Sequence, residues 1–285
     1  MGWAMEIPVV HYRLGWKPAG YQAGLVSGVN AGLGDTLRAV VPWLEYPDPR
    51  RLDVRATLRD PFEKLWVRDF KRNTAIQVMA LVDGSASMAY QGVHARPQVV
   101  GDLLFTLARS AYAAGDAFGC SVAAAQLQAA LCLPPRISRS APLWIQRQWP
   151  QFQPAGDRVD GLFEAAAGLS KRKSLVFLVS DFHWPPAVLN ALLKRLSHHD
   201  VVPVLLEDPA ERQPQTGSGF ANLQDMESGR QRFVWLNQAT RHTLQQRAAA
   251  HVQSVAALCQ RHGRRLFLLN GAFSAPSLTQ YFIQR

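Results

Sequence analysis

Short apolar runs, separated by segments with helical spacing, most constrain what this chain can fold into. Nearly continuous apolar runs occupy positions 76–82, 175–179, 201–206 and 266–269, and positions 118–125 indicate a further strand. Runs of this length are typical of strands that are buried on both faces. After the first run, Val100, Leu103 and Leu107 fall on one face of a helix. Strands that alternate with helices predict the α/β class, with a mostly parallel sheet flanked by helices.

The first 73 residues differ from the rest of the chain. They are rich in Gly, Pro and aromatic residues and lack a long periodic segment, which predicts short strands and loops. We therefore expect a β-rich N-terminal extension at residues 1–73, packed on a core domain at residues 74–285. Within the core domain, residues 223–236 are expected to form a hairpin insertion that turns at Ser228 and Gly229.

Composition favours a globular protein that is not embedded in a membrane. Hydrophobic residues make up 48% of the 285-residue chain, enough to bury a core. The sequence shows no apolar stretch of about 18 residues and no secretory signal pattern. Cys120, Cys132 and Cys259 show no metal-type spacing, and so few thiols suit a reducing compartment. We therefore expect a cytoplasmic protein.

The net charge of +10 raises the question of an acidic partner. Arginine is spread along the chain instead of forming one run, so we expect no nucleic-acid binding. A nucleic-acid-binding protein with a basic surface stays open as an alternative.

Polar residues follow two of the apolar runs at the point where each strand ends. Asp83, Ser85 and Ser87 follow the first run at alternate positions, and Asp181 comes shortly after the run at 175–179. Because ligands bind at the carboxyl ends of parallel strands, these side chains are expected to converge there. Their oxygens suit Mg²⁺, Mn²⁺ or Ca²⁺. In the simpler alternative, Asp and Ser only stabilise a turn or a helix start.

The Asp-x-Ser-x-Ser-Met pattern at positions 83–88 resembles the metal-ion-dependent adhesion site (MIDAS) of von Willebrand factor A domains. More narrowly, residues 30–285 resemble the bacterial domain-of-unknown-function-58 family, whose A-like proteins are associated with MoxR ATPases. The resemblance is carried by segments at 46–53, 68–72, 83–88, 180–182, 208–211 and 223–229. It implies a von Willebrand factor A-like fold, in which the two serines bind the metal directly and the aspartates often act through water.

One position departs from the family pattern. A loop threonine commonly supplies a further metal ligand, but positions 107–215 contain no threonine. The equivalent position falls near Asp160, with Val159 as the other candidate. Asp160 is therefore predicted to be a metal ligand together with Asp83, Ser85, Ser87 and Asp181.

The resemblance predicts a metal-dependent protein-binding module and not an enzyme. The implied partner is a MoxR-type AAA+ ATPase, and the pair would act like a chaperone in the maturation or metal loading of a client enzyme complex that the sequence does not identify. Peripheral association with a membrane complex is a further expectation.

The alternative is a metal-dependent hydrolase that uses the same carboxylates, although no convincing base is found. The sequence contains no Walker loop or Gly-x-Gly-x-x-Gly pattern, so the chain is not expected to bind nucleotide. Asp208 and Glu211 are expected to organise a turn.

Overall fold

The computed structural model describes residues 9–12, 14, 16, 23–44, 49–62, 64–212, 219–224 and 231–285. The chain divides into two compact units. The larger unit comprises residues 1–14, 77–113 and 117–285, and the smaller comprises residues 15–76 and 114–116. The division therefore differs from the expected boundary at residue 73, because residues 9–12 belong with the larger unit. Val10 and His11 each donate a backbone hydrogen bond there, to Ser110 Oγ and Thr279 Oγ1 respectively.

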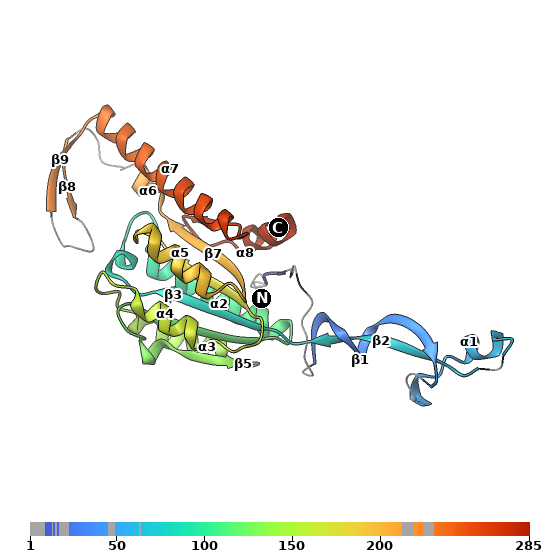
Figure 1. The fold of residues 1–285 in the computed structure, drawn as a ribbon. Helices are drawn as coiled ribbons and strands as arrows, with labels where there is room; N and C mark the ends of the chain where they lie inside the picture. Colours follow the sequence, from blue (N-terminus) through green and yellow to red (C-terminus); the bar gives the residue numbers. More distant parts are fainter. Residues whose placement is uncertain are drawn as a thin grey trace, which may run out of the picture. The chain divides into compact units, whose positions relative to one another are not determined.

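A six-stranded sheet forms the centre of the larger unit, with the order β10-β7-β6-β3-β4-β5 (Figure 1). Its strands are β3 (Gln77–Asp83), β4 (Ala117–Ala123), β5 (Leu133–Arg136), β6 (Leu175–Ser180), β7 (Asp200–Glu207) and β10 (Phe267–Asn270). All neighbouring strands are parallel except β4 and β5. Every residue of β6 and β7 is buried, as continuous apolar runs predict. The predicted α/β class with a mostly parallel sheet is confirmed.

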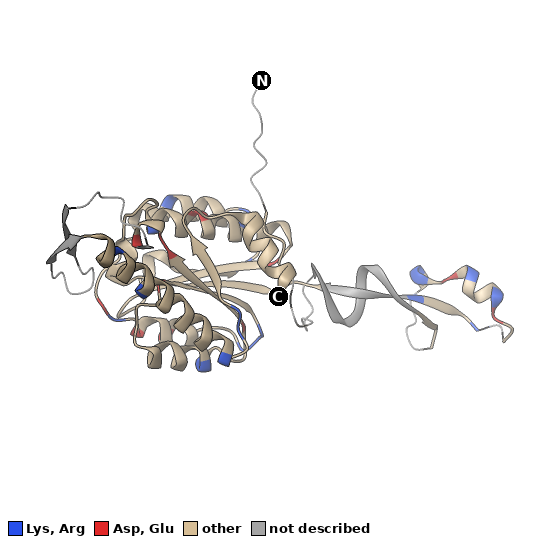
Figure 2. Ribbon diagram, turned by 90° about the horizontal axis from the view of Figure 1, so that it is seen from above, with Lys and Arg blue, Asp and Glu red and all other residues tan. Residues whose placement is uncertain are grey.

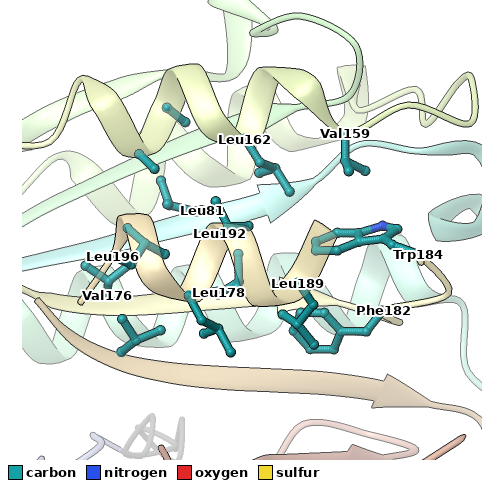
Figure 3. Packing of buried hydrophobic residues seen from close by; sticks show 14 of the residues in the cluster. Leu81, Val159, Leu162, Val176, Leu178, Phe182, Trp184, Leu189, Leu192 and Leu196 are labelled. Carbon is teal, nitrogen blue, oxygen red and sulfur yellow. The ribbon is translucent and has the colours of Figure 1, made fainter. Parts of the chain in front are cut away.

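Helices cover both faces of this sheet. They are α2 (Arg96–Ala113), α3 (Ala141–Gln148), α4 (Asp160–Ala167), α5 (Pro186–Arg195), α7 (Gln238–Arg261) and α8 (Ala275–Gln284), with a short α6 (Pro209–Arg212) after β7. On one face, Leu81 and Leu178 pack in a cluster with residues of α4, α5 and α7 (Figure 3). On the other face, Phe177 meets Phe282 of α8 edge to face. Figure 2 shows the charged residues of this unit mainly on helices and loops.

The predicted hairpin insertion appears as the antiparallel pair β8 (Gly219–Gln224) and β9 (Gln231–Leu236). Its predicted turn at Ser228 and Gly229 lies outside the described residues. Among the residues that are described, no helix is both long and apolar enough to span a bilayer.

The smaller unit consists of β1 (Ala23–Pro42) paired antiparallel with β2 (Trp66–Thr74). The expectation of short strands is wrong here, because β1 extends over 20 residues, with several register shifts along the pairing. Between the strands lie the 3₁₀ turn η1 (Pro49–Arg51) and the helix α1 (Val54–Arg59). Asp53 caps α1 by accepting a hydrogen bond from the Ala56 N–H, and its carboxylate also pairs with Arg68.

Candidate functional site

The candidate site lies where β3 and β6 end. Asp83 is the last residue of β3, and Ser85 and Ser87 follow in the loop that enters the 3₁₀ helix η2 (Ala86–Ala89). Asp181 comes directly after β6. Because β3 and β6 are parallel neighbours, their carboxyl ends meet at one edge of the sheet. The structure therefore brings together four of the five residues that the sequence singled out.

Asp83 is completely buried and accepts hydrogen bonds from several groups of the protein. Its Oδ1 accepts the Ser85 N–H at 2.8 Å, and its Oδ2 accepts Ser180 Oγ at 2.7 Å and Trp184 Nε1 at 3.0 Å. Burial, together with the nearby charge of Asp181, raises the pKa of Asp83 to about 6. Trp184 was not anticipated from the sequence, since an indole that donates to a buried carboxylate has no pattern of its own.

The two serine hydroxyls lie side by side, with 3.2 Å between Ser85 Oγ and Ser87 Oγ. The loop that carries them is bound to the segment at Ala155 and Gly156. The Ala155 N–H donates to the Gly84 carbonyl, and the Ala86 N–H donates to the Gly156 carbonyl. Ala155 and Gly156, which make these backbone hydrogen bonds, carry no side-chain hydroxyl.

Asp160 does not join the other four residues through any contact that the structure describes. It starts α4, its side chain is 57% exposed, and it pairs with Arg158 at 2.6 Å. Val159, the other candidate for this position, is buried in the apolar cluster of Figure 3. Neither residue stands in for the missing threonine in this structure.

Arg96 is a residue of the site that sequence reasoning missed. It starts α2, and its side chain is only 5% exposed. Its Nη1 donates to Asp181 Oδ2 and to the Ser87 carbonyl, both at 2.8 Å, and its Nη2 donates to Glu211 Oε1 at 2.7 Å. A basic residue in the first turn of a helix opposes the helix dipole. That unfavourable position was the one available signal that Arg96 has a specific role.

Cationic and hydrogen-bonding groups stabilise the charged form of Asp181. Burial alone would raise its pKa, but the hydrogen bond from His183 and the charge of Arg96 outweigh burial and hold the pKa below its usual range. His183 Nδ1 lies 3.3 Å from Asp181 Oδ2, and the His183 ring stacks on His251. His251 in turn hydrogen-bonds the backbone carbonyl of Asp181 at 2.8 Å.

The turn after β7 closes this part of the site. Glu211 Oε2 accepts the Asp208 N–H, and Asp208 accepts the N–H groups of Val93, His94 and Ala210. The expectation that Asp208 and Glu211 organise a turn is confirmed. In addition, this turn is tied to the loop that precedes α2 and to Arg96.

The residues fit a divalent cation only in part. The hydroxyl separation is close to the value of about 3 Å between adjacent ligands of an octahedral Mg²⁺. However, the Asp83 oxygens accept three protein donors, Asp181 Oδ2 is occupied by the Arg96 guanidinium, and no third hydroxyl faces the serines. Within the described ranges, no group of three or more His, Cys, Asp or Glu residues is arranged to hold a metal ion. The arrangement therefore fits the ion only in part, and the metal site stays a prediction.

A mostly parallel sheet with an Asp-x-Ser-x-Ser loop at the carboxyl ends of its central strands defines an α/β domain of the von Willebrand factor A-like class. A family model described as "Protein of unknown function DUF58" matches residues 47–254, so the chain belongs to this family.

Individual relatives were also found. The chain is 41% identical over 69 residues to "Uncharacterized protein in moxR 3'region" from Paracoccus denitrificans, a match that covers 24% of this chain and 66% of that protein. Similar solved structures include BatB from Bacteroides thetaiotaomicron, at 14% identity and a TM-score of 0.46, covering 74% of this chain and 98% of that one. The SpRpn10 VWA domain is similar at 12% identity and a TM-score of 0.38, covering 74% and 96% of the two chains.

Proposed function

We propose that this chain is a protein-binding module that partners a MoxR-type AAA+ ATPase, and that the pair acts like a chaperone in the maturation or metal loading of an enzyme complex. The observation that carries the proposal is the 41% identical relative in the moxR 3' region. A chain without a nucleotide-binding loop needs a separate protein to supply ATP-driven work, and an AAA+ ATPase would supply it.

The carboxyl-end edge of the sheet is the proposed contact surface. Ligands of open α/β sheets bind at this edge, and here it carries the cluster formed by Asp83, Ser87, Arg96, Asp181 and Glu211. The exposed loop around Val93 lies at the same edge, because its backbone is held by Asp208 just after β7.

The arrangement of these side chains supports binding more than catalysis. A serine nucleophile needs a base within hydrogen-bond reach of its hydroxyl. Within the described part of the chain, His183 contacts Asp181 and His251, and neither Ser85 Oγ nor Ser87 Oγ contacts a histidine. We therefore propose that the chain is not an enzyme.

The test is a binding measurement between this protein and the MoxR-type ATPase of the same organism, with and without ATP, by surface plasmon resonance. Val93→Asp places a charge at the carboxyl-end edge, where Val93 is 46% exposed. Ile137→Asp is the matched control, because Ile137 is 47% exposed and follows β5 at the opposite edge. We expect Val93→Asp to weaken binding and Ile137→Asp to leave it unchanged. Absence of binding under every condition rejects the ATPase as partner, and equal effects of the two variants reject the edge.

A further inference from the structure

We infer that Arg96, not a metal ion, is the cation of this site that binds a partner's carboxylate, and that Glu211 is a built-in competitor for it. The expected ligand is an Asp or Glu side chain of the partner. This inference rests on the proposed function, since it names the partner chemistry of the same edge.

On one edge of the Arg96 guanidinium, only one of the two donor groups has a hydrogen-bond acceptor among the described residues. Nη1 is committed to Asp181 and to the Ser87 carbonyl, on the inner side of the site. Nη2 donates to Glu211, while Nε is buried and has no hydrogen-bond partner among the described residues. Nε and Nη2 form the fork with which arginine binds a carboxylate through two parallel hydrogen bonds. A buried donor without a partner is costly, so this edge is preorganised for a second acceptor oxygen.

Glu211 accepts a hydrogen bond from only one of these two donors, Nη2. Its Oε1 accepts from Arg96 Nη2, and its Oε2 turns away to accept the Asp208 N–H at 2.9 Å. Its side chain is 24% exposed, which is more than that of Arg96 or Asp181. A carboxylate that bound both Nε and Nη2 would form two charge-assisted hydrogen bonds in place of one. Glu211 thus occupies the position of an acidic ligand, but with weaker geometry.

A cavity provides a route to Glu211. It has a volume of about 320 Å³ and is lined by His183 and Glu211 on one side and by Leu244, Arg247 and His251 of α7 on the other. Arg247, which is always charged, would attract an incoming carboxylate and repel a metal cation.

The first measurement uses sodium acetate as a minimal carboxylate and follows the Nε–H signal of Arg96 by ¹H–¹⁵N NMR, against sodium chloride at equal ionic strength. The signal is assigned by its loss in Arg96→Lys, which keeps the charge but removes the fork. We expect acetate to shift this signal in Glu211→Gln, where the competitor has lost its charge, and to shift it less in the wild type. No shift in Glu211→Gln overturns the inference.

The second measurement is the affinity for the ATPase. We expect Glu211→Gln to bind several-fold more tightly than the wild type, and Arg96→Lys to bind more weakly because lysine cannot form two parallel hydrogen bonds. Glu164→Gln, at an exposed glutamate on α4, is the matched control and should change nothing. Unchanged affinity in Glu211→Gln contradicts the competitor role. An acetate shift without any ATPase binding would reject the proposed partner and leave the carboxylate site standing.

Discussion

Arg96 and Asp181 form a buried ion pair, with 2.8 Å between Arg96 Nη1 and Asp181 Oδ2, that joins the start of α2 to the end of β6. The pair neutralises a carboxylate at the position where the family resemblance predicts a metal ligand. It therefore decides both the local stability of the site and the kind of ligand that the site can hold.

Arg96→Gln is expected to destabilise the fold by up to about 3–5 kcal/mol, because it removes the guanidinium that pairs with the buried Asp181 carboxylate and leaves only His183 as its ionisable partner among the described residues. The double variant Arg96→Gln/Asp181→Asn should recover part of this loss, since both charges are then absent. The measurement is the free energy of unfolding in urea. The control is Arg158→Gln, which breaks the exposed pair with Asp160 and should cost less than about 1 kcal/mol. Equal losses in the two single variants would contradict the role given to the buried pair.

The sequence pattern and the observed contacts lead to opposite expectations for metal binding. The pattern predicts weak Mg²⁺ or Mn²⁺ binding that is lost in Asp83→Ala and in Ser85→Ala/Ser87→Ala. The contacts of Asp83 and Asp181 lead us to expect no saturable heat on titration with either ion, and no effect of EDTA on ATPase binding measured without ATP. Isothermal titration calorimetry checks both. A saturable heat that disappears in Asp83→Ala would restore the metal site. Ser138→Ala/Ser140→Ala is a matched control, because these exposed hydroxyls lie 2.9 Å apart elsewhere in the chain.

Asp160→Ala should leave both stability and ATPase binding nearly unchanged. Its side chain is exposed and its described partner is the exposed Arg158, and substitutions at such positions usually change stability by less than about 0.5 kcal/mol. Thermal unfolding and surface plasmon resonance check the two expectations. A clear loss of partner binding, with the fold intact by circular dichroism, would show that Asp160 belongs to the contact surface.

Hydrolysis is not expected for phosphoesters, carboxylic esters or peptides, because no histidine is in contact with the serine hydroxyls in the described structure. Turnover is measured with the wild type and with Asp181→Asn, which keeps the shape of the side chain. Activity in the wild type that vanishes in a folded Asp181→Asn protein would favour the hydrolase alternative over the binding module.

The sequence by itself determined the α/β class and the place of the cluster. Continuous apolar runs are visible without a structure, because a strand that is covered on both faces excludes polar residues. The rule that parallel strands end at one edge then brings Asp83, Ser85, Ser87 and Asp181 together. In the N-terminal part, the same reasoning did not anticipate the length of β1, because the Gly- and Pro-rich composition was taken to indicate short strands and loops.

Only the tertiary structure decided which charges complete the cluster. Arg96 reaches Asp181 and Glu211 across sequence separations of 85 and 115 residues, and no local pattern records such pairings. Asp160 occupies a plausible position along the chain, yet the first turn of α4 directs its carboxylate to Arg158. A pairing between charges depends on where buried side chains meet in space, whereas the strands depend on local hydrophobicity, and so the sequence predicts the strands far better than the pairs.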